Sequence, residues 1–338
     1  MLTTQFTITK RCNLDCSFCY VTHEDTDMTV GVFDTLYEDV KARNEEYTFD
    51  FFGGEPLLNW ELVQHAVPLL KQDPLCKKIR LFSNGLLLTE DIVSYLVDNT
   101  VEFTLSHQEP WPPELLPLIH KLTNRATVMV TPENINSFPY TYLEFLDRYQ
   151  LIADFRLLRE PVWTSEDVYR FSVEYPRLCE HYVKRLRDTR QNCIPKIISY
   201  YLYKMINGLL QYKQKQYCGA GDSIVCYNPD GNTYPCERYA NENTKSPDNF
   251  MTVMDQCNSC QWGKVCERGC LHQRLLHGTN ENLCKMYGVI YTNIAWLAEE
   301  LKDDSIWIDY ISGMVQDGRQ KDNGREHRRQ TQSYDAGC

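Results

Sequence analysis

Three cysteines stand close together near the start of the chain, at Cys12, Cys16 and Cys19 in the run KRCNLDCSFCY. A four-iron cluster has four irons to ligate, so three thiolates leave one iron open to a substrate or cofactor. Zinc prefers four protein ligands, commonly two C-x2-C pairs or a Cys/His quartet. The C-x3-C-x2-C spacing therefore favours an open iron–sulfur cluster, with zinc and buried free cysteines as the alternatives.

A glycine-rich motif follows in the stretch FDFFGGEPLL, where Gly53, Gly54, Glu55 and Pro56 come directly after an apolar, β-prone run. Paired glycines let the backbone approach a ligand closely, and the carboxylate supplies acceptor oxygens at the end of the predicted strand. GGEP taken by itself has an alternative interpretation as a strand-terminating turn.

A second cysteine group lies between residues 218 and 284. Fifteen cysteines in 338 residues, without an export signal, favour metal binding over a disulfide framework. Part of the group has the spacing C-x2-C-x5-C-x3-C. Its members are Cys218, Cys226, Cys236, Cys257, Cys260, Cys266, Cys270 and Cys284.

Six short β-prone runs alternate with amphipathic helical stretches over the first 160 residues, which indicates a parallel sheet covered by helices. Six such units fall short of a closed eight-stranded barrel, so we predict an α/β fold with a partial (β/α)6 TIM-like barrel. Ligands of such folds lie at the carboxyl ends of the strands, where both motifs fall. The predicted strands are 4–8, 47–52, 78–83, 101–105, 126–130 and 154–158.

The rest of the chain is predicted as a small loop-rich, cysteine-rich domain with a β-hairpin in SIVCYNPDGNTYPC, ordered by bound metal because its apolar periodicity is weak. The expected divisions are a barrel over 1–163, a helical bridge over 164–215, the cysteine-rich domain over 216–290, a closing helix over 291–314 and a disordered polar tail over 315–338.

Charge and hydropathy exclude several classes. A formal net charge of −11 argues against a general nucleic-acid binder, which needs a basic face. No apolar run reaches the eighteen or so residues of a membrane span, and the N-terminal residues show no signal-peptide pattern. These features predict a cytoplasmic protein without a membrane partner.

The two N-terminal motifs together resemble the radical S-adenosylmethionine (radical SAM) superfamily, whose signature is C-x3-C-x2-C with an aromatic residue, here Phe18, before the last cysteine. The resemblance implies a 4Fe-4S cluster on Cys12, Cys16 and Cys19. S-adenosylmethionine (SAM) would bind the open iron, and the GGEP segment would contact its amine. One electron would then cleave SAM to methionine and a 5′-deoxyadenosyl radical that abstracts a substrate hydrogen, so the cofactor carries the hard chemistry.

The resemblance implies further SAM contacts after later strands. Ser83 and Asn84 match the family's polar contact on the third strand. Ser106 aligns with a Ser-Leu-Asp-Gly run of many relatives, although His107 and Gln108 replace the following pair. The last two, Thr131 and Asn134, lie where the family places ribose contacts, with helix capping as the alternative for Thr131.

The C-terminal cysteines are similar to the seven-cysteine pattern of the SPASM extension, which in relatives holds two auxiliary 4Fe-4S clusters. The implied distal ligands are Cys257, Cys260, Cys266 and Cys284, and the implied proximal ligands are Cys218, Cys236 and Cys270. The proximal set lacks a fourth member. Cys226 is the candidate, with a buried hairpin thiol as the alternative, and zinc is the alternative for 257–266.

Glu237 follows Cys236 where the sulfatase-maturing branch of the family has an Asp proposed to take a proton during substrate oxidation. A carboxylate beside a cluster is suited to that role, although Glu lengthens the reach by one methylene. Four neighbouring polar residues are expected at the surface rather than in the same cavity: Arg238, Tyr239, His272 and Arg274.

The resemblance spans about residues 4–295 and implies an enzyme that oxidatively modifies a peptide or protein side chain, by crosslinking or by formylglycine-type oxidation. A radical SAM enzyme acting on a small molecule and a non-catalytic iron–sulfur or zinc scaffold are the alternatives. The implied partners are a peptide or protein substrate and an electron donor such as flavodoxin or ferredoxin. Because a predicted strand begins by residue 4, we expect no N-terminal leader-recognition domain, so a separate leader-peptide-binding protein would supply that function, or the substrate would bind without one.

Overall fold

The computed structural model describes residues 1–107, 110–160, 162–210, 218–241, 257–266 and 268–322. The chain forms two compact units. The first contains residues 1–127 and 219–248, and the second contains 128–218 and 249–338. Among the helices in the described ranges, none is long and apolar enough to cross a bilayer.

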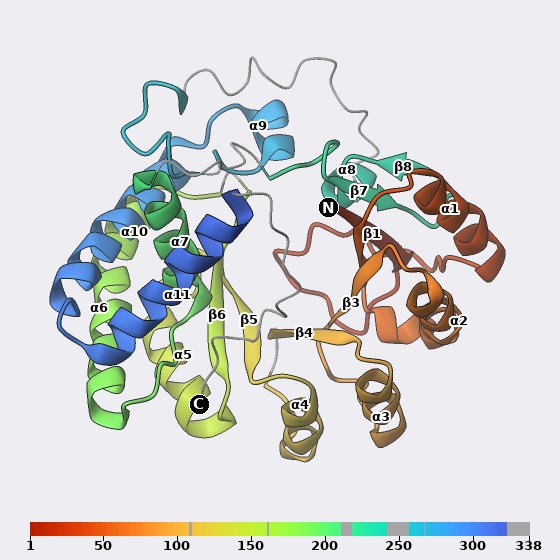
Figure 1. Cartoon of the computed structure of the whole chain (residues 1–338), viewed down its shortest axis with the longest axis horizontal. Coiled ribbons are helices and arrows are strands. Elements are labelled where there is room, and N and C mark those ends of the chain that lie inside the picture. The colour runs from red at the N-terminus through yellow and green to blue at the C-terminus, as the bar shows by residue number, and fades with distance from the viewer. Residues whose placement is uncertain (108–109, 161, 211–217, 242–256, 267, 323–338) are drawn as a thin grey trace. The chain divides into compact units, whose positions relative to one another are not determined.

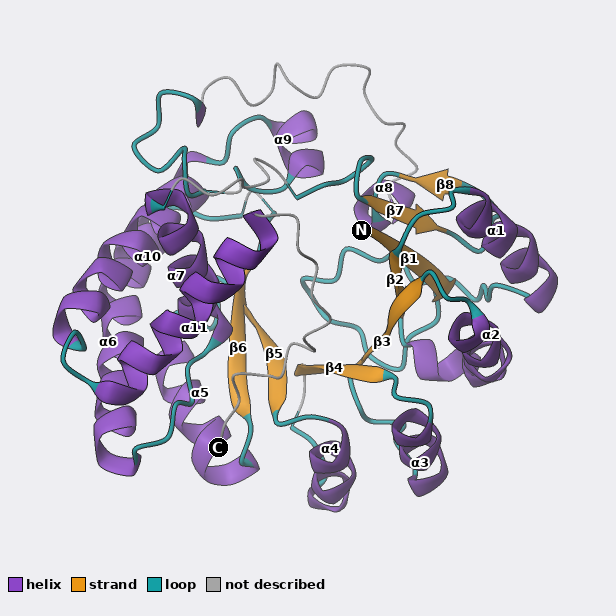
Figure 2. Cartoon of the chain, in the orientation of Figure 1, coloured by secondary structure: helices purple, strands orange, loops and turns teal. Residues whose placement is uncertain are grey.

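All six predicted strands of the partial barrel are present, and their alternation with helices confirms the α/β class (Figures 1 and 2). Strands β1 to β4 pair in parallel in the order of the chain. Strand β5 begins in the first unit and ends in the second, where it neighbours β6. The bounds are β1 (Leu2–Thr9), β2 (Tyr47–Gly53), β3 (Cys76–Ser83), β4 (Glu102–His107), β5 (Arg125–Val130) and β6 (Ile152–Leu157).

The helices of the first unit cover one face of its strands and bury an aromatic core. Phe6 on β1 stacks on Phe49 of β2 with ring centroids 4.6 Å apart and packs against Phe33 of α1 at 5.5 Å. Thr89 accepts the Ile92 N–H at 3.3 Å, which confirms its predicted capping role. The elements are α1 (Val30–Ala42), η1 (Pro56–Asn59), α2 (Trp60–Gln72), α3 (Glu90–Asp98), η2 (Pro113–Leu115) and α4 (Leu116–Leu122).

The predicted hairpin is present as β7 (Ile224–Tyr227) and β8 (Thr233–Tyr234), which pair in an antiparallel manner. Gly231 in its turn has a φ of +79°, a value that glycine adopts without strain. Strand β7 also pairs in parallel with β1, so the hairpin extends the sheet of the first unit. A short helix, α8 (Glu237–Asn241), follows the hairpin.

The second unit is mainly helical. Helix α6 packs against α10, and Tyr201 of α7 meets Tyr291 of α10 edge to face with ring centroids 5.5 Å apart. A Thr164–Asp167 capping box starts α6. The elements are α5 (Phe138–Glu144), the π-helical turn η3 (Phe145–Tyr149), α6 (Ser165–Thr189), α7 (Lys196–Leu209), α9 (Leu271–His277), α10 (Glu281–Glu300) and α11 (Ser305–Asp322).

The end of the chain differs from the prediction of one closing helix and a disordered tail from residue 315. There are two helices, and α11 continues to Asp322. Trp307, Tyr310 and Met314 are buried at helical spacing, and α11 contacts α7. The buried residues of α11 are few and are separated by Gly and Asp, so the pattern of apolar residues did not predict this helix. Residues 323–338 of the predicted tail lie outside the described residues.

Asp50 on β2 is a buried carboxylate paired with Arg80 on β3. Arg80 Nε lies 2.6 Å from Asp50 Oδ1, and Nη2 lies 2.6 Å from Oδ2. Burial raises the pKa of Asp50 from 3.8 to about 6, although Arg80 lowers it. The free-energy cost of removing the Asp50 carboxylate from water is therefore larger than the stabilisation from its ion pair with Arg80.

Asp50 is expected to make the stability of the fold pH-dependent. Because the folded protein holds this proton more tightly than the unfolded chain, the contribution of Asp50 is greatest below pH 3.8 and is lost as the pH rises through about 6. The loss is about 3 kcal/mol. The loss is measured by urea unfolding of wild type and Asp50→Asn across this pH range. A difference in unfolding free energy between the two proteins that does not change with pH contradicts the expectation.

Candidate functional site

The loop that carries the N-terminal cysteines is closed at its base by Asp27. Thr9 Oγ1 donates to Asp27 Oδ1 at 2.5 Å, and Arg11 Nε donates to the same oxygen at 2.9 Å. Arg11 also reaches the Leu58 carbonyl at 3.0 Å. These contacts hold the loop at the carboxyl end of β1. Within it, Cys12, Cys16 and Phe18 are half-buried and Cys19 is exposed.

The two glycines of GGEP pack directly against this loop. The Gly54 N–H donates to the Thr9 carbonyl at 2.9 Å, and the Glu55 N–H donates to the Arg11 carbonyl at 2.8 Å. A Cβ atom at Gly54 would lie 2.1 Å from the Arg11 oxygen, and one at Gly53 would lie 2.1 Å from the Thr9 oxygen. The close approach that requires glycine is thus made by Thr9 at the end of β1 and by Arg11 in the cysteine loop.

Glu55 joins the ends of β2 and β3. Its buried carboxylate accepts hydrogen bonds from Ser83 Oγ at 2.8 Å, the Asn84 N–H at 2.9 Å and the Leu57 N–H at 3.1 Å. Burial raises the pKa of Glu55, and these three hydrogen bonds lower it. The buried Pro56 begins η1 directly after it. Glu55 and Ser83, predicted separately as site residues, are therefore brought together.

Asn84 links the third strand to the cysteine loop. Its Nδ2 donates to Asn13 Oδ1 at 2.8 Å, and its Oδ1 accepts the Leu86 N–H at 2.9 Å. Ser106 is half-buried near the end of β4 in the same unit. Gln108, the nearby departure from the family run, lies outside the described residues.

The other two predicted SAM contacts belong to the second unit. Asn134 Oδ1 accepts the Thr131 N–H at 2.8 Å, and its Nδ2 donates to the Met129 carbonyl at 2.8 Å, so Asn134 closes the turn after β5. The helix-capping alternative for Thr131 is wrong, because α5 begins at Phe138 with Ser137 as the preceding residue.

The segment after Cys236 meets the cysteine loop within the first unit. The Arg238 guanidinium lies 4.4 Å from the centre of the Tyr20 ring, and the Glu237 N–H donates to Gln5 Oε1 at 3.4 Å. Burial raises the pKa of Tyr20 well above its usual value, and the nearby Glu237 raises it further. Tyr20 was not singled out in the sequence, where its only signal is its place next to Cys19.

Cys226 lies on β7 and is fully buried. Its sulfur is 3.7 Å from Thr7 Oγ1 on β1, and burial raises the pKa of its thiol. This setting favours the packing role over the ligand role. Of the three implied proximal ligands, the buried Cys236 belongs to the first unit, whereas the half-buried Cys218 and Cys270 belong to the second.

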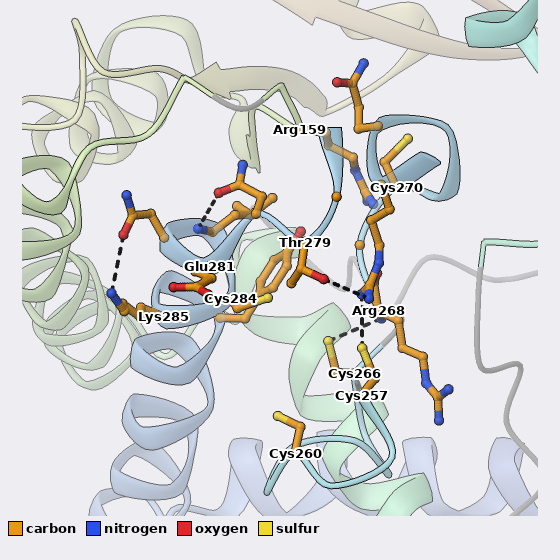
Figure 3. A pocket seen from close by; sticks show the side chains of 18 of the residues that line it. Arg159, Cys257, Cys260, Cys266, Arg268, Cys270, Thr279, Glu281, Cys284 and Lys285 are labelled. Carbon is orange, nitrogen blue, oxygen red and sulfur yellow. Dashed lines mark hydrogen bonds between the residues drawn. The ribbon is translucent and has the colours of Figure 1, made fainter. Parts of the chain in front are cut away.

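A cavity of about 470 Å³ in the second unit gathers the other C-terminal cysteines. Four of them come from the 257–266 loop and from α10 (Figure 3). Burial raises the pKa of Cys266 to about 11, and the neighbouring Cys284, Cys257 and Cys260 thiols also raise it. The cysteines that line the cavity are Cys257, Cys260, Cys266, Cys270 and Cys284.

Zinc and an iron–sulfur cluster make different demands on the cysteines that line this cavity. In the part of the chain that the structure describes, no three His, Cys, Asp or Glu side chains are arranged to hold one metal ion. Tetrahedral zinc needs all its sulfurs about 2.3 Å from one centre, whereas a 4Fe-4S cluster spreads its thiolates over separate irons.

Three polar side chains predicted at the surface are buried instead. Tyr239 and His272 are 1% exposed, and Arg274 is 6% exposed. The surface prediction is wrong for these residues. For Arg274 the reason is visible, because its guanidinium finds hydrogen-bond acceptors inside the second unit.

Comparison with known proteins assigns the first part of the chain. Residues 6–138 match the Radical SAM superfamily, a range that includes the cysteine loop and GGEP. The chain contains a radical SAM domain.

Two curated relatives share part of their sequence with this chain. The radical SAM cyclopropyl synthase TigE of Paramaledivibacter caminithermalis is 27% identical over 126 residues, which are 31% of this chain and 27% of that protein. The cysteine-type anaerobic sulfatase-maturating enzyme of Clostridium perfringens is 21% identical over 325 residues, which cover 77% of this chain and 85% of that enzyme.

Solved structures show the same fold. The structure of anSMEcpe with bound AdoMet and the Cp18Cys peptide has a TM-score of 0.67 at 18% identity, covering 89% of this chain and 99% of that one. Streptococcus suis SuiB bound to its precursor peptide SuiA has a TM-score of 0.53 at 16% identity, covering 83% and 74%. These likenesses extend past the radical SAM domain.

Proposed function

We propose that this protein is a radical SAM enzyme with a SPASM extension that oxidatively modifies a peptide or protein side chain. The observation that carries the proposal is the packing of the Cys12 loop on GGEP, with three thiols at the carboxyl end of β1. The peptides bound in the anSMEcpe and SuiB structures support a peptide substrate.

In this proposal, Cys12, Cys16 and Cys19 hold a 4Fe-4S cluster beside SAM. When bound, the cluster and SAM supply the 5′-deoxyadenosyl radical that removes a substrate hydrogen. The protein's own contribution is to hold the site in a fixed geometry. Glu55 links the ends of β2 and β3, and Asn84 links the cysteine loop to them. The proposed SAM contacts are Phe18, Gly53, Gly54, Glu55, Pro56, Ser83, Asn84, Ser106, Thr131 and Asn134.

Two auxiliary 4Fe-4S clusters complete the proposed site. Cys257, Cys260, Cys266 and Cys284 would hold one, and Cys218, Cys236 and Cys270 the other. Flavodoxin or ferredoxin would supply electrons, and a separate protein would present any leader peptide. A cytoplasmic location stays a prediction from the sequence.

Anaerobic reconstitution tests the proposal. We expect about twelve irons per chain and, with SAM and dithionite, formation of 5′-deoxyadenosine and methionine. Adding extracts of host peptides and following their masses would then identify the modified substrate. A chain that holds its clusters but forms no 5′-deoxyadenosine would be a scaffold, contrary to the proposal.

Glu237 is proposed to accept the proton that the oxidised side chain releases. Glu237→Gln should lower the rate of peptide modification by about 10²-fold and leave 5′-deoxyadenosine formation without peptide unchanged. The exposed Glu114→Gln is the matched control, and both rates should stay at the wild-type level there. If Glu237→Gln and wild type modify the peptide at the same rate, Glu237 is not the proton acceptor.

A further inference from the structure

Arg274 is a buried cation in the cysteine-lined cavity of the second unit, and it projects from α9. Its Nη1 donates to Cys257 Sγ at 3.0 Å and to the Arg268 carbonyl at 3.0 Å. Its Nη2 donates to Thr279 Oγ1 at 3.2 Å. Figure 3 shows the Cys257 sulfur and the Thr279 hydroxyl pointing toward this part of the cavity.

These contacts join three segments that carry cysteines. Cys257 begins the 257–266 loop, Arg268 lies between Cys266 and Cys270, and Thr279 stands just before α10, which carries Cys284. A planar guanidinium offers several donors in fixed directions, so it can hold such segments in register. The Arg268 N–H adds a second donor to sulfur, at 3.3 Å from Cys266 Sγ.

We infer that Arg274 is a positioning residue that raises the reduction potential of an iron–sulfur cluster on Cys257, Cys260, Cys266 and Cys284. The inference rests on the proposed auxiliary cluster. One-electron reduction adds a negative charge to a cluster, and a buried cation that donates to a ligand sulfur stabilises the reduced form more than the oxidised form. Hydrogen bonds to sulfur and net charge are among the features that set such potentials.

The location of Arg274 also gives this cluster a role. A cluster with a raised potential accepts an electron more readily than one without a buried cation at its sulfurs. Arg274 would therefore help the cluster on Cys257 to accept the electron that leaves an oxidised substrate. Its effect is on the cluster and not on the substrate, so it should be visible without any peptide.

The test uses the full chain with Cys12, Cys16 and Cys19 replaced by alanine, so that only auxiliary clusters are present. Midpoint potentials are measured by redox titration followed by electron paramagnetic resonance, and iron is measured on the same samples. In Arg274→Gln we expect the reduction equilibrium of one cluster to fall at least tenfold, which is about 59 mV for one electron. Arg274→Lys keeps the positive charge but loses the planar guanidinium. Its midpoint potential should therefore lie between those of the parent chain and Arg274→Gln.

Arg187→Gln is the matched control, because this exposed arginine near the end of α6 pairs with Glu300 and also belongs to the second unit. Its midpoint should equal that of the parent chain. Full iron and an unchanged midpoint in Arg274→Gln overturn the inference. If Arg274→Gln loses iron, the same measurement is made on Arg274→Lys. Full iron and an unchanged midpoint potential in Arg274→Lys then overturn the inference. A parent chain without auxiliary iron would instead refute the proposed cluster, and the inference with it.

Discussion

Cys16→Ala should abolish SAM cleavage while leaving iron on the C-terminal cysteines. Only Cys12 and Cys19 would remain as thiolate ligands on the N-terminal loop, which is too few to keep a four-iron cluster. The loop itself should stay folded, because Cys16 contributes its carbonyl to the Cys19 N–H at 2.9 Å and alanine keeps that carbonyl. We expect 5′-deoxyadenosine formation to fall at least about 10³-fold and iron to fall by about four per chain.

Cys76→Ala is the control for this experiment. Cys76 begins β3, is half-buried and belongs to neither cysteine group. Its replacement should change neither the iron content nor the rate of SAM cleavage. If Cys16→Ala cleaves SAM at the wild-type rate, the cluster is not on this loop.

Gly54→Ala should have nearly as large an effect without touching a ligand. The added Cβ would lie 2.1 Å from the Arg11 carbonyl oxygen and 3.1 Å from Cys12 Cβ. Both neighbours are close to the backbone and cannot rotate away, so the Arg11–Cys12 segment must move. That movement also breaks the hydrogen bond from the Glu55 N–H to the Arg11 carbonyl.

We therefore expect Gly54→Ala to lose the N-terminal cluster, to slow SAM cleavage at least about 100-fold and to cost roughly 1–3 kcal/mol of stability, because overpacking forces the backbone to shift. Gly31→Ala is the control, since no atom lies within 4 Å of a Cβ at that helical position. It should cleave SAM normally and gain a few tenths of a kcal/mol or more in helix stability. A Gly54→Ala chain with full iron and normal cleavage would show that this packing does not hold the loop.

The sequence by itself determined the features that depend on local spacing. The alternation of apolar residues placed six strands and their helices, and Thr89 marked a helix start by its own side chain. The C-x3-C-x2-C and GGEP motifs predicted the radical SAM domain, because the chemistry fixes the residue types and the loop length fixes their separation.

The tertiary structure decided what depends on contacts between distant residues. Gly53 and Gly54 are glycines because Thr9 and Arg11 lie against them, and Glu55 is buried because β3 brings Ser83 to it. The pairing of β7 with β1 and the burial of Arg274 beside Cys257 likewise join residues separated in the chain. A residue's partners in a packed interior are set by the path of the whole backbone, which no local pattern records.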